Sequence, residues 1–167
     1  MSDTKSNLEE AFAGESQANR KYLFFAEKAD ADGHKQVARL FRAAAEAETV
    51  HARNHLKVLG GIKSTADNLK AAVGGEQHEF TEMYPGFIQQ AKAEGKGDAE
   101  RSFDLANRVE QIHHGLFRSA LDSLEKGQGS EGKKFYVCQV CGYTVEGEAP
   151  DKCPVCGAAR KMFKTVE

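Results

Sequence analysis

The sequence predicts an all-α four-helix bundle in residues 1–130, followed by a small four-cysteine metal-binding domain in residues 131–167. Three observations lead to this prediction. Four long segments repeat their apolar residues with the period of an α-helix. Two of these segments contain the pattern Glu-x-x-His, at residues 48–51 and 110–113. All four cysteines lie within residues 138–156, with the spacing C-x2-C-x11-C-x2-C.

The bulk composition narrows the class of protein. A chain of 167 residues has room for one domain and a small appendage, and 40% hydrophobic residues are enough for a core. The net charge of −2 argues against nucleic acid as a partner. No apolar stretch follows the first residues, Met-Ser-Asp-Thr-Lys-Ser, and no apolar run of about 18 residues occurs. We therefore expect a cytoplasmic protein with no membrane partner.

The first two helices are expected at about residues 4–31 and 35–59. Asp3 or Thr4 is a suitable N-cap for the first helix, and Asp32-Gly33 should end it. Gly60-Gly61 should end the second helix. Their apolar stripes are Leu8, Phe12, Glu15, Asn19, Tyr22 and Ala26, then Val37, Phe41, Ala44, Glu48, His51, His55 and Val58.

The third helix should open after Ser64 or Thr65 and end at Gly95 and Gly97, with a kink at Pro85. Asp98 is expected to cap a fourth helix that runs to about residue 126. Residues 127–134 are rich in glycine and charge, which is typical of a linker. The stripes of these helices are Leu69, Val73, Glu76, Phe80, Met83 and Phe87, then Phe103, Ala106, Glu110, His113, Phe117 and Leu124.

The two halves of the helical region repeat each other. Glu15 matches Glu76 at an offset of 61, whereas Glu48 and His51 match their counterparts in residues 110–113 at an offset of 62. The slip of one residue falls between Glu76 and Ala91, around Pro85, where we expect a local bulge. A helical hairpin duplicated in tandem explains these matches.

Glutamates occupy the apolar stripes of all four helices. An unpaired buried carboxylate costs several kcal/mol, so a bundle core does not hold five of them without cations. Two ferrous ions nearly neutralise five carboxylates, and a mixture of carboxylates and imidazoles suits iron or manganese better than zinc, calcium or magnesium. One Glu from each of two helices and a Glu-x-x-His from each of the others form the ligand set of ferritin-like di-iron bundles. The candidate ligands are Glu15, Glu48, His51, Glu76, Glu79, Glu110 and His113.

Other polar residues on the helices have less defined roles. His55 is expected to be a core residue, His34 and His114 surface or rim residues, and His78 is expected to point away from the site. Tyr22 and Tyr84 fit two roles equally well, hydrogen bonding to ligand carboxylates or filling the core.

The cysteine spacing predicts a single four-thiolate metal site. Cysteines in a chain expected in the cytoplasm bind metal rather than form disulfides. A glycine follows the second cysteine of each pair, Gly142 and Gly157, and permits a turn whose backbone N–H groups point at the sulfurs. Four thiolates in a tetrahedron bind either zinc or one iron, and the spacing does not choose between them.

Several stretches together resemble the rubrerythrin family over nearly the whole chain. They are Ala11-Phe-Ala-Gly-Glu-Ser-Gln, Gly75-Glu-Gln-His-Glu-Phe-Thr-Glu-Met-Tyr-Pro, the second Glu-x-x-His, and the tail Cys-x2-Cys-Gly-Tyr…Cys-Pro-x-Cys-Gly. The resemblance implies a ferritin-like bundle with a C-terminal rubredoxin-like domain. It also implies a non-haem di-iron peroxidase for oxidative-stress defence, which reduces hydrogen peroxide to water with electrons that enter through a rubredoxin-type iron.

The resemblance also implies roles for individual residues. The seven candidate ligands match the family's di-iron ligands, with Glu48 and Glu110 as the bridging pair. In the family one iron exchanges a glutamate for a histidine on reduction, and Glu79 and His51 match these residues. The resemblance implies one iron, or zinc after heterologous expression, on Cys138, Cys141, Cys153 and Cys156. Two features depart from the family: a short segment between the second and third helices, and a shorter spacer between the cysteine pairs than in free-standing rubredoxins.

Two alternatives remain open beside the peroxidase. The bundle alone fits a ferroxidase or iron-handling protein of the ferritin-like class, although such a protein has no need of the four-cysteine electron supply. A regulatory module with structural zinc in its tail is the third reading. The peroxidase would need an external electron donor, such as a rubredoxin or an NAD(P)H-dependent reductase.

The short connection between the second and third helices predicts a homodimer. In ferritin-like order this connection must run back along the bundle, a span of roughly 38 Å for helices of about 25 residues. Six residues, 60–65, reach only ~21 Å when extended. An up-down-up-down bundle or a domain swap would resolve the conflict. We favour the swap, in which residues 1–59 of one chain pack on residues 66–126 of another.

Overall fold

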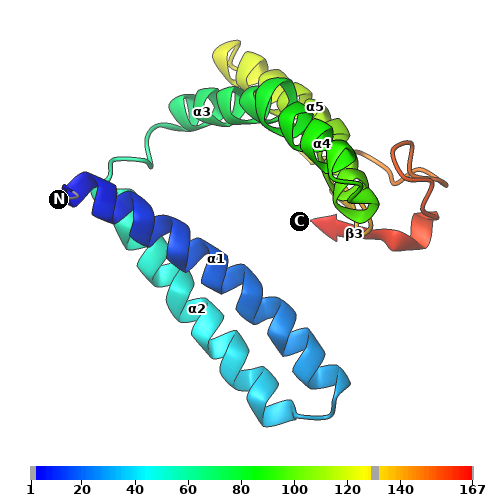
Figure 1. Ribbon diagram of the computed structural model, residues 1–167. Coiled ribbons are helices and arrows are strands. Elements are labelled where there is room, and N and C mark those ends of the chain that lie inside the picture. Colours follow the sequence, from blue (N-terminus) through cyan, green and yellow to red (C-terminus); the bar gives the residue numbers. More distant parts are fainter. Residues whose placement is uncertain (1–2, 129–131, 167) are drawn as a thin grey trace. The chain divides into compact units, whose positions relative to one another are not determined.

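The computed structural model describes residues 3–128 and 132–166. The chain divides into two compact units, Met1–Lys63 and Ser64–Glu167, and each is described here by itself (Figure 1). The first unit is a pair of helices, and the second contains further helices and a small sheet. Along the described residues, no helix combines the length and the apolar character needed to cross a membrane.

The first unit is an antiparallel hairpin of α1 (Thr4–Ala31) and α2 (Lys35–Val58) (Figure 1). Asp3 caps α1, because its carboxylate accepts a hydrogen bond of 2.8 Å from the Ser6 backbone N–H. Gly33 adopts a φ of +84° in the turn between the helices, a conformation that glycine accepts without strain. The predicted limits of both helices are therefore confirmed to within a residue.

Small residues let α1 and α2 approach closely. Ala26, Ala29 and Ala38 are buried, and Phe41 packs against them. A polar contact fixes the register of the two helices: the Asn19 amide donates to the Ala45 carbonyl at 2.7 Å and to the Thr49 hydroxyl at 2.9 Å. The hairpin is thus fixed along its length by both packing and hydrogen bonds.

The third predicted helix is one continuous rod in three parts. These are α3 (Thr65–His78), the π-helical turn η1 (Glu79–Met83) and α4 (Tyr84–Ala93). Ser64 caps α3 by accepting from the Asp67 N–H at 3.2 Å, as expected. The fourth helix is α5 (Gly97–Glu125).

The predicted role of Asp98 is wrong. The residue that precedes α5 is Lys96, which makes no side-chain capping bond, and Asp98 lies in the first turn of the helix. The chain turns at Gly95, whose φ is +65°, and enters the helix earlier than the capping pattern suggested. Within the first turn, the Asp98 carboxylate still interacts favourably with the positive end of the helix dipole.

The π turn η1 is the bulge that the sequence repeat predicts. The Tyr84 N–H donates to the Glu79 carbonyl, five residues earlier, which is the hydrogen bond of a π-helix. One extra residue is thereby accommodated just before Pro85, which has no N–H to donate. This accounts for the slip of the repeat from 61 to 62 residues.

The duplication is also visible in the packing of aromatic rings. Each hairpin holds a triad of one tyrosine and two phenylalanines at equivalent positions, with ring centroids 5.5–6.4 Å apart. The triads are Tyr22, Phe25 and Phe41 in the first unit, and Tyr84, Phe87 and Phe103 in the second. The repeated sequence therefore builds the same packing twice.

The tail of the second unit forms a three-stranded antiparallel sheet in the order β2-β1-β3. Its strands are β1 (Phe135–Cys138), β2 (Thr144–Glu146) and β3 (Phe163–Val166), and the short 3-10 helix η2 (Arg160–Met162) precedes β3. Residues 129–131 of the expected linker lie outside the described residues. The expected domain boundary between residues 130 and 131 stays a prediction.

Deleting Thr81 from η1 should convert the π turn into regular α-helix and rotate the two ends of the rod against each other. Glu76 and the Tyr84–Phe87 pair then cannot both keep their contacts with α5. We expect the free energy of unfolding to fall by about 2 kcal/mol, with the helical circular dichroism kept. Thr81→Ala is the matched control, since it keeps the residue count and removes the γ-methyl group and the hydroxyl that bonds the Gln77 carbonyl. Equal stability of the deletion and the control would contradict the register role of the π turn.

Candidate metal centres

The first unit brings Glu15, Glu48 and His51 together. Glu48 and His51 lie one turn apart on α2, and Glu15 faces them from α1. His51 Nδ1 is 2.9 Å from Glu48 Oε2 and 3.8 Å from Glu15 Oε1. We call this group the N-terminal half-site.

The second unit builds the same arrangement from Glu76, Glu110 and His113. Glu76 comes from α3, and the other two residues lie one turn apart on α5. His113 Nδ1 is 2.8 Å from Glu110 Oε2 and 4.0 Å from Glu76 Oε2. We call this group the C-terminal half-site. In each half-site the ligand atoms lie within 4.8 Å of one another.

The donor chemistry of the two half-sites fits non-haem iron. Each offers two carboxylates and one imidazole, the mixture that suits a redox-active iron ion. Taken together, the carboxylates and histidines fit a di-iron site. The structure places six of the seven predicted ligands in the two half-sites, three in each. The seventh, Glu79, is outside the three-residue group and begins the π turn one helical turn after Glu76.

Crowding of negative charge marks the C-terminal half-site. Burial, a hydrogen bond with Glu110 and repulsion from Glu110 and Glu79 raise the pKa of Glu76 from 4.5 to about 7. Burial and the Glu110 charge also raise the pKa of Glu79. Burial raises the pKa of Tyr84, and the charges of Glu110, Glu79 and Glu76 raise it further. Cations at this position would relieve the repulsion between these carboxylates.

The remaining polar residues are not gathered into either half-site. His34 and His78 are exposed, and His78 lies 3.3 Å from Glu82. His114 is half-buried against the edge of Phe80, and His55 is also half-buried. Tyr22 belongs to the aromatic triad of the first hairpin.

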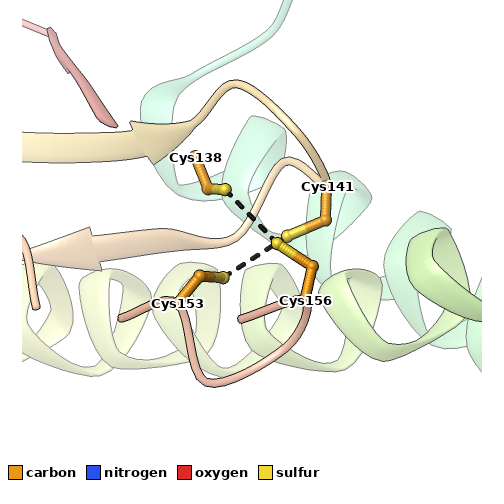
Figure 2. Close-up of side chains that lie close together, drawn as sticks. All are labelled: Cys138, Cys141, Cys153 and Cys156. Carbon is orange, nitrogen blue, oxygen red and sulfur yellow. Dashed lines mark hydrogen bonds between the residues drawn. The ribbon is translucent and has the colours of Figure 1, made fainter. Parts of the chain in front are cut away.

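The four cysteines converge from two loops of the tail (Figure 2). Cys138 is the last residue of β1 and Cys141 lies in the β1–β2 loop, and Cys153 and Cys156 lie in the loop that precedes η2. The Cys138–Cys156 and Cys141–Cys153 sulfurs are 3.7 Å and 3.5 Å apart. A tetrahedron with metal–sulfur bonds of about 2.3 Å has sulfur–sulfur separations of about 3.8 Å. The cluster therefore fits a rubredoxin-like iron site.

Backbone N–H groups point at the sulfurs, as the two glycines predict. Gly142 and Gly157 have φ values of +85° and +78°, and their N–H groups close the two turns onto Cys138 and Cys153 carbonyls. Burial raises the pKa of the Cys141 thiol, and a hydrogen bond from the Tyr143 N–H partly opposes this. At Cys153, N–H groups of Cys156 and Val155 outweigh burial and lower the pKa. A metal ion would take the place of the thiol protons.

The second unit also joins its two metal-ligand clusters. His113 Nε2 lies 3.0 Å from the Thr144 hydroxyl at the start of β2, and a Cβ added at Gly142 would lie 3.7 Å from Val109 on α5. Thr144 is a residue that the sequence analysis missed. No local pattern marks it, because its contact depends on how the tail packs against α5.

The high pKa of Glu76 predicts a stability that depends on pH in the protein without di-iron metal. The folded chain keeps a proton on this carboxyl that the unfolded chain releases between 4.5 and about 7. Stability should therefore fall as pH rises through this window, and Glu76→Gln should remove that part of the fall. Thermal unfolding at pH 5 and pH 7.5 would measure it. Glu27→Gln, at an exposed position on α1, is the control. Identical pH profiles for wild type and Glu76→Gln would contradict the shift.

The model of the family described as rubrerythrin matches residues 6–121. A second model, described as the rubredoxin-like domain of rubrerythrin, matches residues 136–164. Among curated relatives, rubrerythrin-2 of Clostridium acetobutylicum is 35% identical over 96% of this chain and 95% of its own. Nigerythrin of Nitratidesulfovibrio vulgaris is 32% identical over 98% of this chain and 86% of its own.

A solved structure of nigerythrin in its fully reduced, all-ferrous state has a TM-score of 0.60 with this chain. The two are 32% identical, and the match covers 99% of this chain and 88% of the other. Both half-sites and the four-cysteine cluster lie within the matched segments. The chain belongs to the rubrerythrin family of di-iron oxidoreductases that act against oxidative stress, with a ferritin-like helical region and a rubredoxin-like tail.

Proposed function

We propose that the protein is a peroxidase that reduces hydrogen peroxide to water, with electrons delivered through the four-cysteine iron. The observation that carries this proposal is the contact of the tail with the C-terminal half-site. Thr144, three residues after Cys141, lies 3.0 Å from the candidate iron ligand His113. A one-electron carrier so close to the carboxylate cluster suits a site that must be re-reduced after every turnover.

The overall reaction needs a supply of electrons and protons. One hydrogen peroxide, two electrons and two protons give two waters, and the di-iron pair supplies the electron pair when it is bound and reduced. The four-cysteine site would return electrons one at a time from an external donor, such as a rubredoxin or an NAD(P)H-dependent reductase. The ligands we propose for the two irons are Glu15, Glu48, His51, Glu76, Glu79, Glu110 and His113.

The contact between tail and half-site disfavours the ferroxidase alternative. An enzyme that oxidises and stores Fe(II) obtains its electrons from the iron it takes up. It therefore gains nothing from a second redox centre within reach of its ligands. The two half-sites alone would fit either function, and the four-cysteine tail favours the peroxidase.

Fast mixing of the fully reduced protein with oxidant tests the peroxidase. We expect hydrogen peroxide to oxidise the di-iron pair at least tenfold faster than dioxygen does. Cys141→Ser should abolish steady-state turnover with an external donor, because electrons no longer enter, and should leave one fast oxidation of the chemically reduced protein.

The control is Glu110→Ala, which should lose iron from the carboxylate site and keep the visible thiolate-to-iron bands of the tail. If hydrogen peroxide oxidises the di-iron pair no faster than dioxygen does, the peroxidase assignment is overturned. Unchanged turnover in Cys141→Ser would overturn the role of the tail as electron donor.

We also propose that the active form is a domain-swapped homodimer. Each half-site has three ligands, too few for two irons, and each belongs to a different compact unit of the chain. Residues 59–64 connect α2 to α3. These six residues reach ~21 Å, whereas a return along a helix of 24 residues needs about 36 Å. A half-site from one chain would therefore meet the complementary half-site of a second copy.

Exposed apolar side chains also support a second copy as partner. Large apolar side chains of the hairpin are exposed, including Phe24, Leu40 and Val58. Such side chains suit a surface that another chain covers.

Mixing two inactive variants tests the swap. Homodimers of Glu48→Ala and of Glu110→Ala should each lack intact sites. In a swapped heterodimer one site carries both substitutions and the other carries neither, so about half of the wild-type iron and turnover should return. Heterodimers purified with two affinity tags, beside both homodimers as controls, give the comparison. A verified heterodimer with no intact site would refute the swap.

A further inference from the structure

We propose that Thr144 is a positioning residue that holds the His113 imidazole in one tautomer and links it by hydrogen bonds to the four-cysteine site. This inference rests on the proposed function for its purpose, although its geometry stands independently. The Thr144 Oγ1 atom lies 3.0 Å from His113 Nε2 and 3.0 Å from the Gly142 carbonyl oxygen.

The direction of these two hydrogen bonds follows from the number of protons. A hydroxyl has one proton to donate and can also accept. The Gly142 carbonyl only accepts, so the Thr144 proton goes to it, and the hydroxyl then accepts a proton from His113 Nε2. The opposite assignment would leave the carbonyl without this bond. His113 therefore carries its proton on Nε2.

This tautomer leaves the Nδ1 lone pair available to a metal ion. Nδ1 is the ring atom that faces the carboxylates, 2.8 Å from Glu110 Oε2, and a metal ion would replace this hydrogen-bond contact. Histidines that ligate metals usually donate their other N–H to a protein group, which fixes the ring orientation. Thr144 is the group that accepts this N–H from His113. It lies in the small sheet of the tail, whereas the other ligands lie on helices.

The same hydroxyl completes a route to the cysteines. Gly142 follows Cys141 directly, so its carbonyl is joined to this ligand by the covalent backbone. From the Cys141 sulfur, the route runs along the backbone to the Gly142 carbonyl and crosses two hydrogen bonds to His113. Val109 of α5 faces Gly142, and a Cβ added at this glycine would lie 3.7 Å from the Val109 side chain.

The other histidine serves as an internal comparison. His51 occupies the equivalent place in the N-terminal half-site, and its side chain is 53% exposed, against 27% for His113. Within the described part of the hairpin, no group bonds His51 Nε2. The structure thus fixes one of the two imidazoles and leaves the other exposed.

Proton NMR of the all-ferrous protein, recorded in H2O and D2O, tests the positioning role. Imidazole N–H protons of iron-bound histidines are shifted away from the diamagnetic range, and their exchange with solvent reports their hydrogen bonding. We expect one slowly and one rapidly exchanging N–H in the wild type. Thr144→Val should accelerate the slow exchange at least tenfold, and Thr144→Ser should restore it. Thr165→Val, at an exposed position in the same sheet, is the matched control.

The link to the cysteines has its own measurement. After the reduced protein is mixed with oxidant, reappearance of the thiolate-to-iron bands reports electron transfer out of the tail. We expect this rate to fall at least fivefold in Thr144→Val and to recover in Thr144→Ser, with the tail's reduction potential unchanged.

The outcomes separate this inference from the proposed function. Slow N–H exchange that persists in Thr144→Val, or that fails to return in Thr144→Ser, would overturn the positioning role. An unchanged transfer rate in Thr144→Val would overturn the link. The NMR measurement uses no oxidant, and the transfer measurement works with either dioxygen or peroxide, so a failure of the peroxidase assignment would leave both results intact.

Discussion

Repulsion among half-buried carboxylates is the constraint on which this structure depends. Glu76 and Glu110 face each other from α3 and α5, and the pKa of Glu76 near 7 shows how strongly the protein resists holding both as anions. A helical core stabilised only by apolar contacts would not accept these residues. Metal ions bound at this position would neutralise the carboxylates, so metal binding and folding of the second unit would be thermodynamically coupled.

The same pattern of coupling appears in the tail, with different chemistry. Its sheet has short strands and few buried side chains, Cys138, Ala149 and Cys153 among them. A domain of this size has little apolar surface to bury, and a metal bond commonly supplies the missing stability. Turns closed by Gly142 and Gly157 prepare the sulfurs for that bond by directing N–H groups at them.

Features that depend on neighbours along one helix were predictable from the sequence. The Glu-x-x-His spacing places both groups on one helical face whatever the tertiary structure, and in each pair the histidine Nδ1 lies within hydrogen-bond distance of the glutamate. The change of the repeat offset from 61 to 62 residues likewise predicted the position of the π turn η1. The prediction that Asp98 caps the fourth helix was wrong. A residue type that favours the N-cap position does not cap when the helix already begins one residue earlier, at Gly97. Thr144 could not be found, since its contact with His113 joins residues 31 positions apart through packing alone.

The π turn makes the two metal positions unlike. It begins at Glu79, and the first hairpin has Gln17 or Ala18 at the matching place, depending on the side of the slip from which one counts. A duplicated hairpin without the added residue would give a symmetric cluster with two identical iron environments. The added residue accompanies an extra carboxylate on one side only, so the two irons would differ in charge and in reduction potential. Two irons held by such unequal ligand sets would lose their electrons in a defined order.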